Sequence, residues 1–416
     1  MQMAVLTWPG KSLASLPAAV LRTEAIIYPQ GRGYPSARPH NRLILGDNLA
    51  VMAALLPEYE GRFRLIYADP PFFTNRKYLA RIGRGEDSRK PAEWQLGEGY
   101  PDHWPNLDAY LDFLYQRLAL MVRLLAADGT LYLHLDWHAD AYARLLLDEL
   151  LGPENLLNEI IWVYHGPSPI RRAFNRKHDT ILAYVKSRDY FFNADAVREP
   201  YNSSTVKTFA SSPRAGFGKV PDLARGKVPE DWWYFPVVAR LHNERTGYPT
   251  QKPQALLERI ILASSSPGDL VGDFFCGSGT TPLMAATLGR RFVACDATFR
   301  ALHTTRCRLT VTQAPFTLER ESAAPFPLKE GCREVELSPG SIRLNASGLD
   351  YWEVDPAWDG TTFKSAAQAL RPVRSNVIPP VLKIESGGRV CLRWVTVEGQ
   401  QFQLHIQTVT HAANGF

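Results

Sequence analysis

Two short loops in the sequence combine residue types that could bind a ligand and act on it. The first is Asp69-Pro70-Pro71-Phe72, which follows an apolar run; its two prolines fix a rigid turn and lack N–H donors. The Pro70 carbonyl and the Asp69 carboxylate are then neighbouring acceptors that suit an –NH2 group, and Phe72 could stack on a planar base. A proline-stiffened loop with a capping acid is the alternative interpretation.

The second loop, Asp273-Phe-Phe-Cys-Gly277-Ser-Gly279-Thr280-Thr281, lies between a strand pattern and a helix pattern. Glycines let the backbone approach a ligand closely, and a helix N-terminus offers free N–H groups. Asp296 ends the next predicted strand, where an acid can accept hydrogen bonds from ribose hydroxyls. Pro282 occupies the third small-residue position of the dinucleotide fingerprint, which favours a ligand without phosphates. A tight turn followed by a solvated acid is the alternative.

The elements that must position these loops alternate between strands and helices. Apolar runs predict strands at 42–47, 63–69, 130–135, 158–164, 180–185, 270–275 and 291–296. Helical spacing predicts helices at 48–56 (ended by Pro57), 107–127, 140–151, 253–264, 280–288 and 299–311. Strand–helix–strand units at this spacing predict an α/β fold with a parallel sheet. Residues 73–105 show no clear period and predict a long functional loop.

Changes in composition predict how the chain is divided. We expect an irregular arm at 1–40, an α/β domain in two parts at 41–197 and 246–320, an inserted lobe at 198–245, and a β-rich module at 321–416. The 47 Lys and Arg against 42 Asp and Glu leave a charge of +5, too small to identify a partner. Five cysteines, an odd number with no close pairing, exclude a disulfide scaffold and fit a cytoplasmic protein, and no apolar run predicts a membrane span.

Together, the two loops resemble those of the amino-group DNA methyltransferases that use S-adenosylmethionine. The first matches that family's catalytic motif and the second its cofactor motif, and further resemblances lie at 46–48, 158–162, 177–182 and 247–253. The catalytic motif precedes the cofactor motif, which resembles the circularly permuted β group over about residues 41–312. The resemblance implies a Rossmann-like methyltransferase sheet with an inserted target-recognition lobe and a small C-terminal β module.

The resemblance also implies roles for individual residues. Catalysis is assigned to Asp69, Pro70, Pro71 and Phe72. The residues expected to bind S-adenosylmethionine are Asp47, Asn48, Asp69, Thr250, Lys252, Asp273, Phe275, Gly277, Ser278, Gly279, Thr280, Thr281 and Asp296. The residues expected to contact DNA are Arg76, Lys77, Arg171, Arg172, Arg176, Lys177, Lys207, Arg214, Lys219, Arg225 and Lys227. An ordinary solvated side chain is the alternative for each of these basic residues. No metal site is expected.

The implied activity is methyl transfer from S-adenosylmethionine to the N6 amine of adenine in double-stranded DNA, with the base flipped out against Phe72. Transfer to N4 of cytosine, methylation of RNA or protein, and a non-catalytic DNA-binding subunit are the alternatives. Methylation of cytosine carbon 5 is excluded, because no cysteine follows a proline. A second copy of the chain and a separately encoded restriction endonuclease are candidate partners, and no membrane partner is expected.

Overall fold

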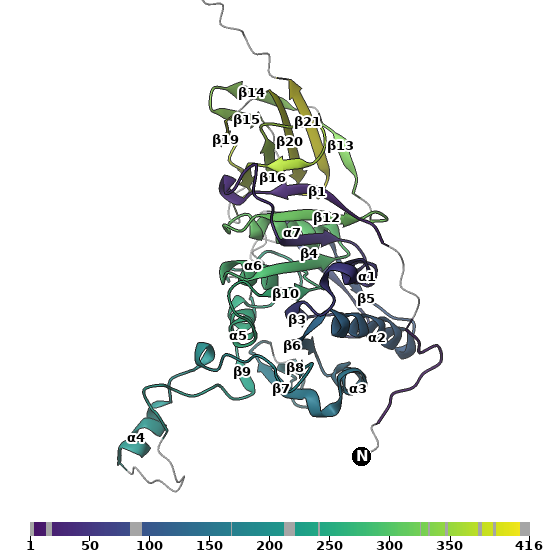
Figure 1. Cartoon of the computed structure of the whole chain (residues 1–416), viewed down its shortest axis with the longest axis vertical. Coiled ribbons are helices and arrows are strands. Elements are labelled where there is room, and N and C mark those ends of the chain that lie inside the picture. Colours follow the sequence, from purple (N-terminus) through teal and green to yellow (C-terminus); the bar gives the residue numbers. More distant parts are fainter. Residues whose placement is uncertain are drawn as a thin grey trace, which may run out of the picture.

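The computed structural model describes residues 4–13, 19–83, 94–167, 169–211, 221–239, 242–324, 326–331, 333–345, 348–372, 377–385 and 388–407. Its main body is an eleven-stranded sheet in the order β17-β1-β12-β2-β11-β10-β3-β6-β8-β7-β9 (Figure 1). Helices cover the sheet, and a separate β module lies at one end of the molecule (Figure 1). No helix within these ranges is long and apolar enough to cross a membrane.

The central six strands of the main sheet run parallel. They are β12 (Phe316–Glu321), β2 (Asn41–Leu45), β11 (Arg291–Asp296), β10 (Leu270–Asp273), β3 (Phe63–Ala68) and β6 (Leu125–Leu135). Beyond β6, the antiparallel strands β8 (His178–Val185) and β7 (Leu156–Val163) are followed by β9 (Trp232–Tyr234), which is parallel to β7. At the other side, β1 (Leu21–Ile27) pairs antiparallel with β12, and β17 (Phe363–Ser365) pairs with β1.

Two apolar clusters show that helices pack on both faces of the sheet. Ile44 belongs to one cluster, whereas its neighbours Leu43 and Leu45 belong to the other, as the two-residue period of a strand requires. The first cluster packs β2 and β3 against α1 (Asn48–Tyr59), α2 (Leu107–Leu124) and α3 (Asp140–Leu151). The second packs the opposite face against α5 (Gln254–Ser264), α6 (Thr280–Thr287) and α7 (Phe299–Leu309). The predicted α/β class is therefore confirmed.

Three local predictions from the sequence are wrong. The arm at 1–40 is not wholly irregular, because Leu21–Ile27 forms β1, whose partner strand lies almost 300 residues further along the chain. Residues 73–105 contain an antiparallel hairpin, β4 (Arg76–Gly83) and β5 (Trp94–Asp102), whose exposed Leu79 and Leu96 blur the alternation of apolar residues. Finally, α1 continues through Pro57, which lies in its last turn and removes only its own N–H from the hydrogen-bond ladder.

The C-terminal residues form two small sheets with their own core. Five strands pair in the order β13 (Leu328–Glu330), β21 (Gln401–Gln407), β20 (Arg389–Thr396), β16 (Leu349–Asp355) and β18 (Ala367–Leu370). Three more pair as β14 (Glu334–Ser338), β15 (Ser341–Asn345) and β19 (Val381–Lys383). Trp352 and Trp394 are buried between them. His303 on α7 contacts Asp350 on β16 at 3.0 Å, which joins this module to the main body.

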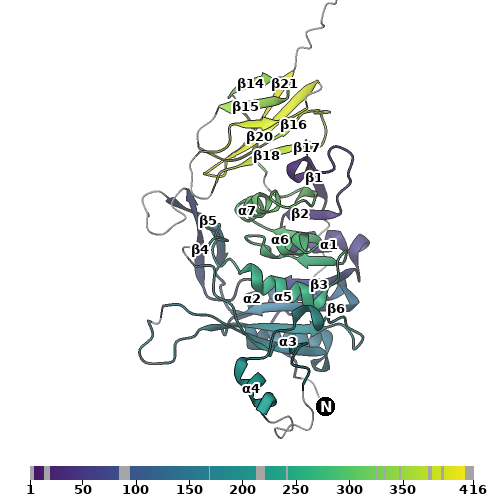
Figure 2. The same cartoon turned by 90° about the vertical axis from the view of Figure 1, so that its left-hand side faces the viewer.

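The described residues of the segment 198–245 contain little regular structure, as the composition of the segment predicts. Its helix α4 (Ser203–Ser211) has no buried residue, and Figures 1 and 2 show it at the end of the molecule opposite the C-terminal module. Short 3-10 helices complete the description at η1 (Pro29–Gly31), η4 (Pro153–Asn155) and η5 (Asp195–Val197).

Candidate functional site

Four acidic residues meet where parallel strands of the main sheet end. Asp47 follows β2, Asp69 follows β3, Asp273 ends β10, and Asp296 ends β11. These strands are neighbours in the order β2-β11-β10-β3 and run in the same direction, so the four carboxylates share one edge. Because α1 joins β2 to β3 across two strands that come later in the chain, this edge is the switch point at which open α/β sheets bind ligands.

A cavity of about 300 Å³ opens at this edge. Every residue predicted to bind the cofactor lines it except Gly279; of the predicted catalytic residues, Asp69 and Pro71 line it, whereas Pro70 and Phe72 do not. Aromatic walls come from Tyr100, Trp104, Phe113 and Tyr248, which the sequence did not single out. Among the described residues that line the cavity, four carboxylates face one lysine, so the cavity favours a cationic ligand over a phosphate.

The two carboxylate oxygens of Asp69 differ in their contacts with the described residues: one pairs with a lysine and the other accepts no hydrogen bond. Its Oδ2 lies 2.5 Å from Nζ of Lys252, whose side chain is almost fully buried. Its Oδ1 is also buried and, within the described part of the chain, accepts no hydrogen bond. A buried acceptor without a donor is costly, so this oxygen is suited to a donor brought by a ligand.

Phe72 lies beside the cavity with its ring against a buried histidine. The rings of Phe72 and His134 stack with centroids 5.8 Å apart at 26°, and Lys252 Nζ lies 5.3 Å from the Phe72 centroid. His134 is held in turn by the Tyr67 hydroxyl at 2.7 Å and by Asp179 at 3.2 Å. These contacts hold the Phe72 ring in place. Stacking of this ring on a target base stays a prediction.

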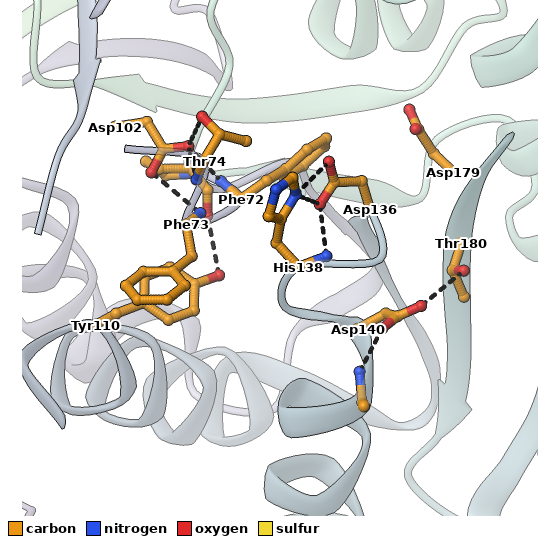
Figure 3. Close-up of polar contacts among 12 residues, drawn as sticks. Phe72, Phe73, Thr74, Asp102, Tyr110, Asp136, His138, Asp140, Asp179 and Thr180 are labelled. Atoms are coloured by element: carbon orange, nitrogen blue, oxygen red, sulfur yellow. Dashed lines mark hydrogen bonds and ion pairs between the residues drawn. The ribbon is translucent and has the colours of Figure 1, made fainter. Parts of the chain in front are cut away.

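Asp102, at the end of β5, holds the loop that follows Asp69. Its carboxylate accepts the backbone N–H groups of Phe72 at 3.2 Å, Phe73 at 3.0 Å and Thr74 at 2.8 Å. It also accepts the Thr74 hydroxyl at 2.7 Å (Figure 3). The Trp104 indole N–H donates to the same carboxylate at 2.8 Å. Phe73 has φ of +66°, a conformation that costs a bulky residue about 1–2 kcal/mol, and the Asp102 contacts stabilise it.

Tyr110 supports the same loop from α2. Its hydroxyl donates to the Pro71 carbonyl at 2.9 Å, and its ring lies 5.1 Å from that of Phe73 (Figure 3). Sequence reasoning missed both Asp102 and Tyr110, because they contact residues 28 to 39 positions earlier and the hairpin that places Asp102 was not predicted. No local pattern in the sequence distinguishes them from an ordinary helix-flanking acid and an ordinary core tyrosine.

Asp47 and Asn48 brace the start of α1 against neighbouring elements. Asp47 caps the helix by accepting the Leu49 N–H at 2.9 Å and pairs with Arg117 Nη2 at 2.8 Å. Asn48 Nδ2 donates to the Phe274 carbonyl at 2.8 Å. Both side chains line the cavity while they hold α1, α2 and the glycine loop together.

The glycine loop is held by the acid at the end of the next strand. Asp296 accepts the N–H of Gly277 at 3.0 Å and the N–H of Thr298 at 2.9 Å. Burial raises the pKa of Asp296, and these hydrogen bonds oppose the increase. Gly277 and Gly279 have φ of +49° and +76°, so the tight turn uses the conformational freedom of glycine.

Gly279→Ala should destabilise the protein. The backbone at Gly279 is left-handed, and an added Cβ would lie 2.5 Å from the Thr305 side chain. We therefore expect a loss of about 2–4 kcal/mol in unfolding free energy. Gly268→Ala is the matched control, because Gly268 has φ of +85° with nothing within 4 Å of an added Cβ. Urea denaturation measures both variants, and equal losses in the two would contradict the steric account.

Asp273 is a buried carboxyl at the base of the cavity. Its Oδ1 accepts the Phe275 N–H at 3.0 Å. Burial, with smaller contributions from the charges of Asp69 and Asp296, raises the pKa of Asp273 to about 7. The carboxyl can therefore change its charge near neutral pH. Within the described residues, no group of three or more His, Cys, Asp or Glu side chains could hold a metal ion.

The basic residues predicted to contact DNA differ in their surroundings. Exposed side chains are those of Arg76, Lys77, Arg171, Arg172, Arg176, Lys207 and Arg225. Lys177 is half-buried and donates to the Pro167 carbonyl. Arg225 and Lys227 form ion pairs with Asp195 and Glu230. Arg214 and Lys219 lie outside the described residues. DNA contact stays a prediction for all of them.

Comparisons with known proteins relate this chain to one family. The family model for N6 and N4 methyltransferases, described as DNA methylase, matches residues 63–305. The chain is 32% identical over 260 residues to the DNA adenine methyltransferase YhdJ of Escherichia coli K12, a match covering 61% of this chain and 77% of that protein. It is 28% identical over 363 residues to the type II methyltransferase M.EcaI of Enterobacter cloacae, covering 72% and 77%.

Among solved structures, the M1.HpyAVI-SAM complex aligns with a TM-score of 0.43 and 20% identity, over 64% of this chain and 98% of that chain. The family model spans more than half of the chain, including the Asp69 loop, the glycine loop and every residue lining the cavity except Asp47 and Asn48. This protein therefore belongs to the family of DNA methylases, and it is a DNA methyltransferase of the adenine-N6 or cytosine-N4 type.

Proposed function

We propose that this protein transfers a methyl group from S-adenosylmethionine to the N6 amine of adenine in double-stranded DNA. The observation that carries the proposal is Asp69 Oδ1, a buried carboxylate oxygen without a donor at the edge of an acid-lined cavity. An exocyclic amine supplies the missing N–H donor. No other buried, unpartnered side-chain oxygen among the described residues belongs to a residue lining this cavity.

The cavity suits S-adenosylmethionine in charge and in shape. The cofactor carries positive charges on its sulfonium and ammonium groups, and the cavity presents the carboxylates of Asp47, Asp273 and Asp296. Aromatic rings of Phe275 and Tyr248 offer walls for the adenine moiety. When bound, the cofactor supplies an electrophilic methyl group. The individual residue roles expected from the family motif are part of this proposal.

The chain's own residues prepare the amine. The lone pair of an exocyclic amine is delocalised into its ring, so the nitrogen is a poor nucleophile. A hydrogen bond to Asp69 Oδ1, and a second to the Pro70 carbonyl, would draw the nitrogen towards tetrahedral geometry and localise that lone pair. Lys252 holds the other oxygen of Asp69 and so orients the carboxylate. The rigid loop supplies proximity, which can contribute much of the rate enhancement, and Asp69 or water accepts the departing proton.

Adenine is the favoured target and cytosine N4 is the second candidate. The Asp-Pro-Pro-Phe motif leans towards adenine, and the relative YhdJ, at 32% identity, is named a DNA adenine methyltransferase. We also infer the circularly permuted β-group arrangement, because the Asp69 loop precedes the glycine loop in the chain. The segment 198–245 is proposed as the target-recognition lobe inserted between the two parts of the catalytic domain.

We propose a separately encoded restriction endonuclease as a functional partner, because M.EcaI and other relatives are named type II methyltransferases. Viability of a host expressing the cognate nuclease, with and without this protein, tests that pairing.

Cofactor affinity should increase with pH around neutrality. The raised pKa of Asp273, about 7, means that the free protein holds a proton there under mildly acidic conditions. A cationic ligand binds more tightly when the Asp273 carboxyl is ionised. Below the pKa, binding must therefore release the proton, and the affinity falls by up to about tenfold for each unit that the pH is lowered. Calorimetric titration from about pH 6 to about pH 8 should show tighter binding at the higher pH. Asp273→Asn should flatten this profile relative to wild type, and an unchanged slope would contradict the assignment.

Incorporation of labelled methyl groups tests the proposed function directly. The protein is incubated with methyl-labelled S-adenosylmethionine and either unmethylated duplex DNA or RNA of matched sequence. We expect label in the duplex DNA and no competition by excess RNA. Label in RNA or in the protein itself would support the alternative substrates, and absence of label in any polymer would contradict the proposal.

A further inference from the structure

The loop between β7 and β8 projects from the catalytic edge of the sheet. β8 runs antiparallel to β6, which is parallel to β3, so β8 begins at the edge where β3 leads into Asp69. The loop from Tyr164 to Lys177 therefore lies at the same edge as the cavity. Figure 2 shows this loop and the β4–β5 hairpin projecting to the same side of the molecule.

Contacts at the base of the loop lead to the predicted base-stacking residue. Asp179, at the start of β8, contacts His134 Nε2 at 3.2 Å and accepts the Tyr164 hydroxyl at 2.9 Å. His134 carries the Phe72 ring on its own ring. The two strand ends that bear the loop are thus linked, through two side chains, to the aromatic ring beside Asp69.

Phe174, at the tip of this loop, has no apolar cover from the residues that the structure describes. Its relative exposure is 98%, which is the highest among the exposed large hydrophobic side chains of the described residues. An aromatic ring exposed in this way gains nothing from folding, so almost its whole surface is available to contact a ligand.

Hydrogen bonds within the loop fix the conformation of its tip, so that Phe174 stays exposed. Asn175 Oδ1 accepts the Ile170 N–H at 3.0 Å, and Asn175 Nδ2 donates to the Ile170 carbonyl at 3.2 Å. This reciprocal pair closes the turn that carries residues 171–174. Nearer the strands, the Tyr164 N–H donates to the Lys177 carbonyl at 3.0 Å.

The charge around the ring identifies the kind of partner. From Tyr164 to Lys177 the sequence has four basic residues and no acidic one, and Arg171, Arg172 and Arg176 are exposed. The Arg176 guanidinium lies 4.0 Å from the ring centroid of Trp137, which is also exposed and follows β6 at the same edge. Positive charge of one sign suits a phosphate backbone, and an apolar side chain between arginines suits insertion between stacked bases.

We propose that Phe174 enters the base stack of duplex DNA where the target base leaves it. This inference rests on the proposed function. Flipping a base out of a duplex costs unstacking and leaves a gap, and a planar ring that fills the gap restores stacking on both neighbours. The flanking arginines contact the phosphates on either side and hold the ring in register. Phe174 is thus a positioning residue for the substrate.

The test compares a paired substrate with one whose target base is already unpaired. The recognition site is first located by sequencing that detects modified bases. Two duplexes are then made with that site, one fully paired and one with an abasic position opposite the target base. Wild type, Phe174→Ala and Phe174→Trp are assayed on both, with Phe192→Ala as the matched control. Phe192 is 40% exposed and follows β8 at the opposite edge of the sheet.

We expect Phe174→Ala to lower kcat/KM on the paired duplex by about 10- to 100-fold. On the abasic duplex it should stay within about threefold of wild type, because stacking no longer has to be replaced. Phe174→Trp should retain activity on both duplexes, and Phe192→Ala should behave as wild type. Melting temperatures should not change, because Phe174 has no packing to lose.

Two results would overturn the inference while leaving the proposed function intact. Wild-type activity of Phe174→Ala on the paired duplex would show that the ring is not needed. An equal loss on both duplexes would show a general grip on DNA rather than insertion. If the wild-type protein methylates neither duplex, the proposed function fails, and this inference fails with it.

Discussion

Replacing Asp69 by alanine should lower the rate of methyl transfer by at least about 100- to 1000-fold, the effect of removing one acceptor or donor aligned with the reacting group. Asp69 Oδ1 is the buried oxygen that would accept the amine hydrogen, and the variant has no substitute for it. The measurement is single-turnover methylation of duplex DNA with saturating cofactor. Cofactor affinity should change much less, because most of the cavity wall comes from other residues.

Stability has to be measured in the same variant, because Asp69 pairs with the buried Lys252. Removing one partner of a buried ion pair can cost about 3–5 kcal/mol in unfolding free energy. Asp69→Asn keeps the shape and one oxygen, and the double variant Asp69→Ala with Lys252→Met removes the unpaired charge. If the double variant recovers stability but not activity, the loss is chemical. Near-normal methylation by any of these variants would contradict the assigned role.

Asp102→Ala should produce the second-largest loss, although Asp102 does not line the cavity. The substitution leaves three consecutive backbone N–H groups and one indole N–H without their acceptor, and it releases the strained Phe73. A shift of about 1 Å in the Asp69 loop can cost about 100-fold in rate. We therefore expect kcat to fall by about that factor while the dissociation constant of the cofactor stays within a few-fold.

Glu98→Ala is the matched control for Asp102→Ala, because Glu98 is an exposed acid on the same strand. It should leave kcat unchanged. A loss of cofactor binding equal to the loss of kcat would mean that Asp102 supports the whole cavity. Normal kcat in Asp102→Ala would contradict its role in positioning the loop.

The parts of the fold that depend on neighbouring residues could be predicted from the sequence. The apolar runs before Asp69 and Asp273 end in strands β3 and β10, and the glycine loop opens α6, because these patterns are local. The rule that parallel strands end at one edge then brings Asp47, Asp69, Asp273 and Asp296 together. The α/β class and the family follow from these local patterns.

The parts that depend on distant partners could not be predicted. β1 pairs with β12, and Asp102 accepts N–H groups about thirty positions earlier, so neither contact leaves a local pattern. The pairing of Lys252 with Asp69 spans 183 positions. Phe174 shows the opposite limit: its apolar character predicts burial, and only the structure shows that the ring is exposed.

We propose above that this protein methylates the N6 amine of adenine in duplex DNA. Mass spectrometry of nucleosides is the most direct test, using duplex DNA incubated with the protein and S-adenosylmethionine that carries a deuterated methyl group. We expect deuterated N6-methyl-2′-deoxyadenosine in the wild-type sample and none in the Asp69→Ala sample. Label in N4-methylcytosine alone would contradict the base assignment, and a labelled nucleoside in the Asp69→Ala sample at wild-type level would contradict the mechanism.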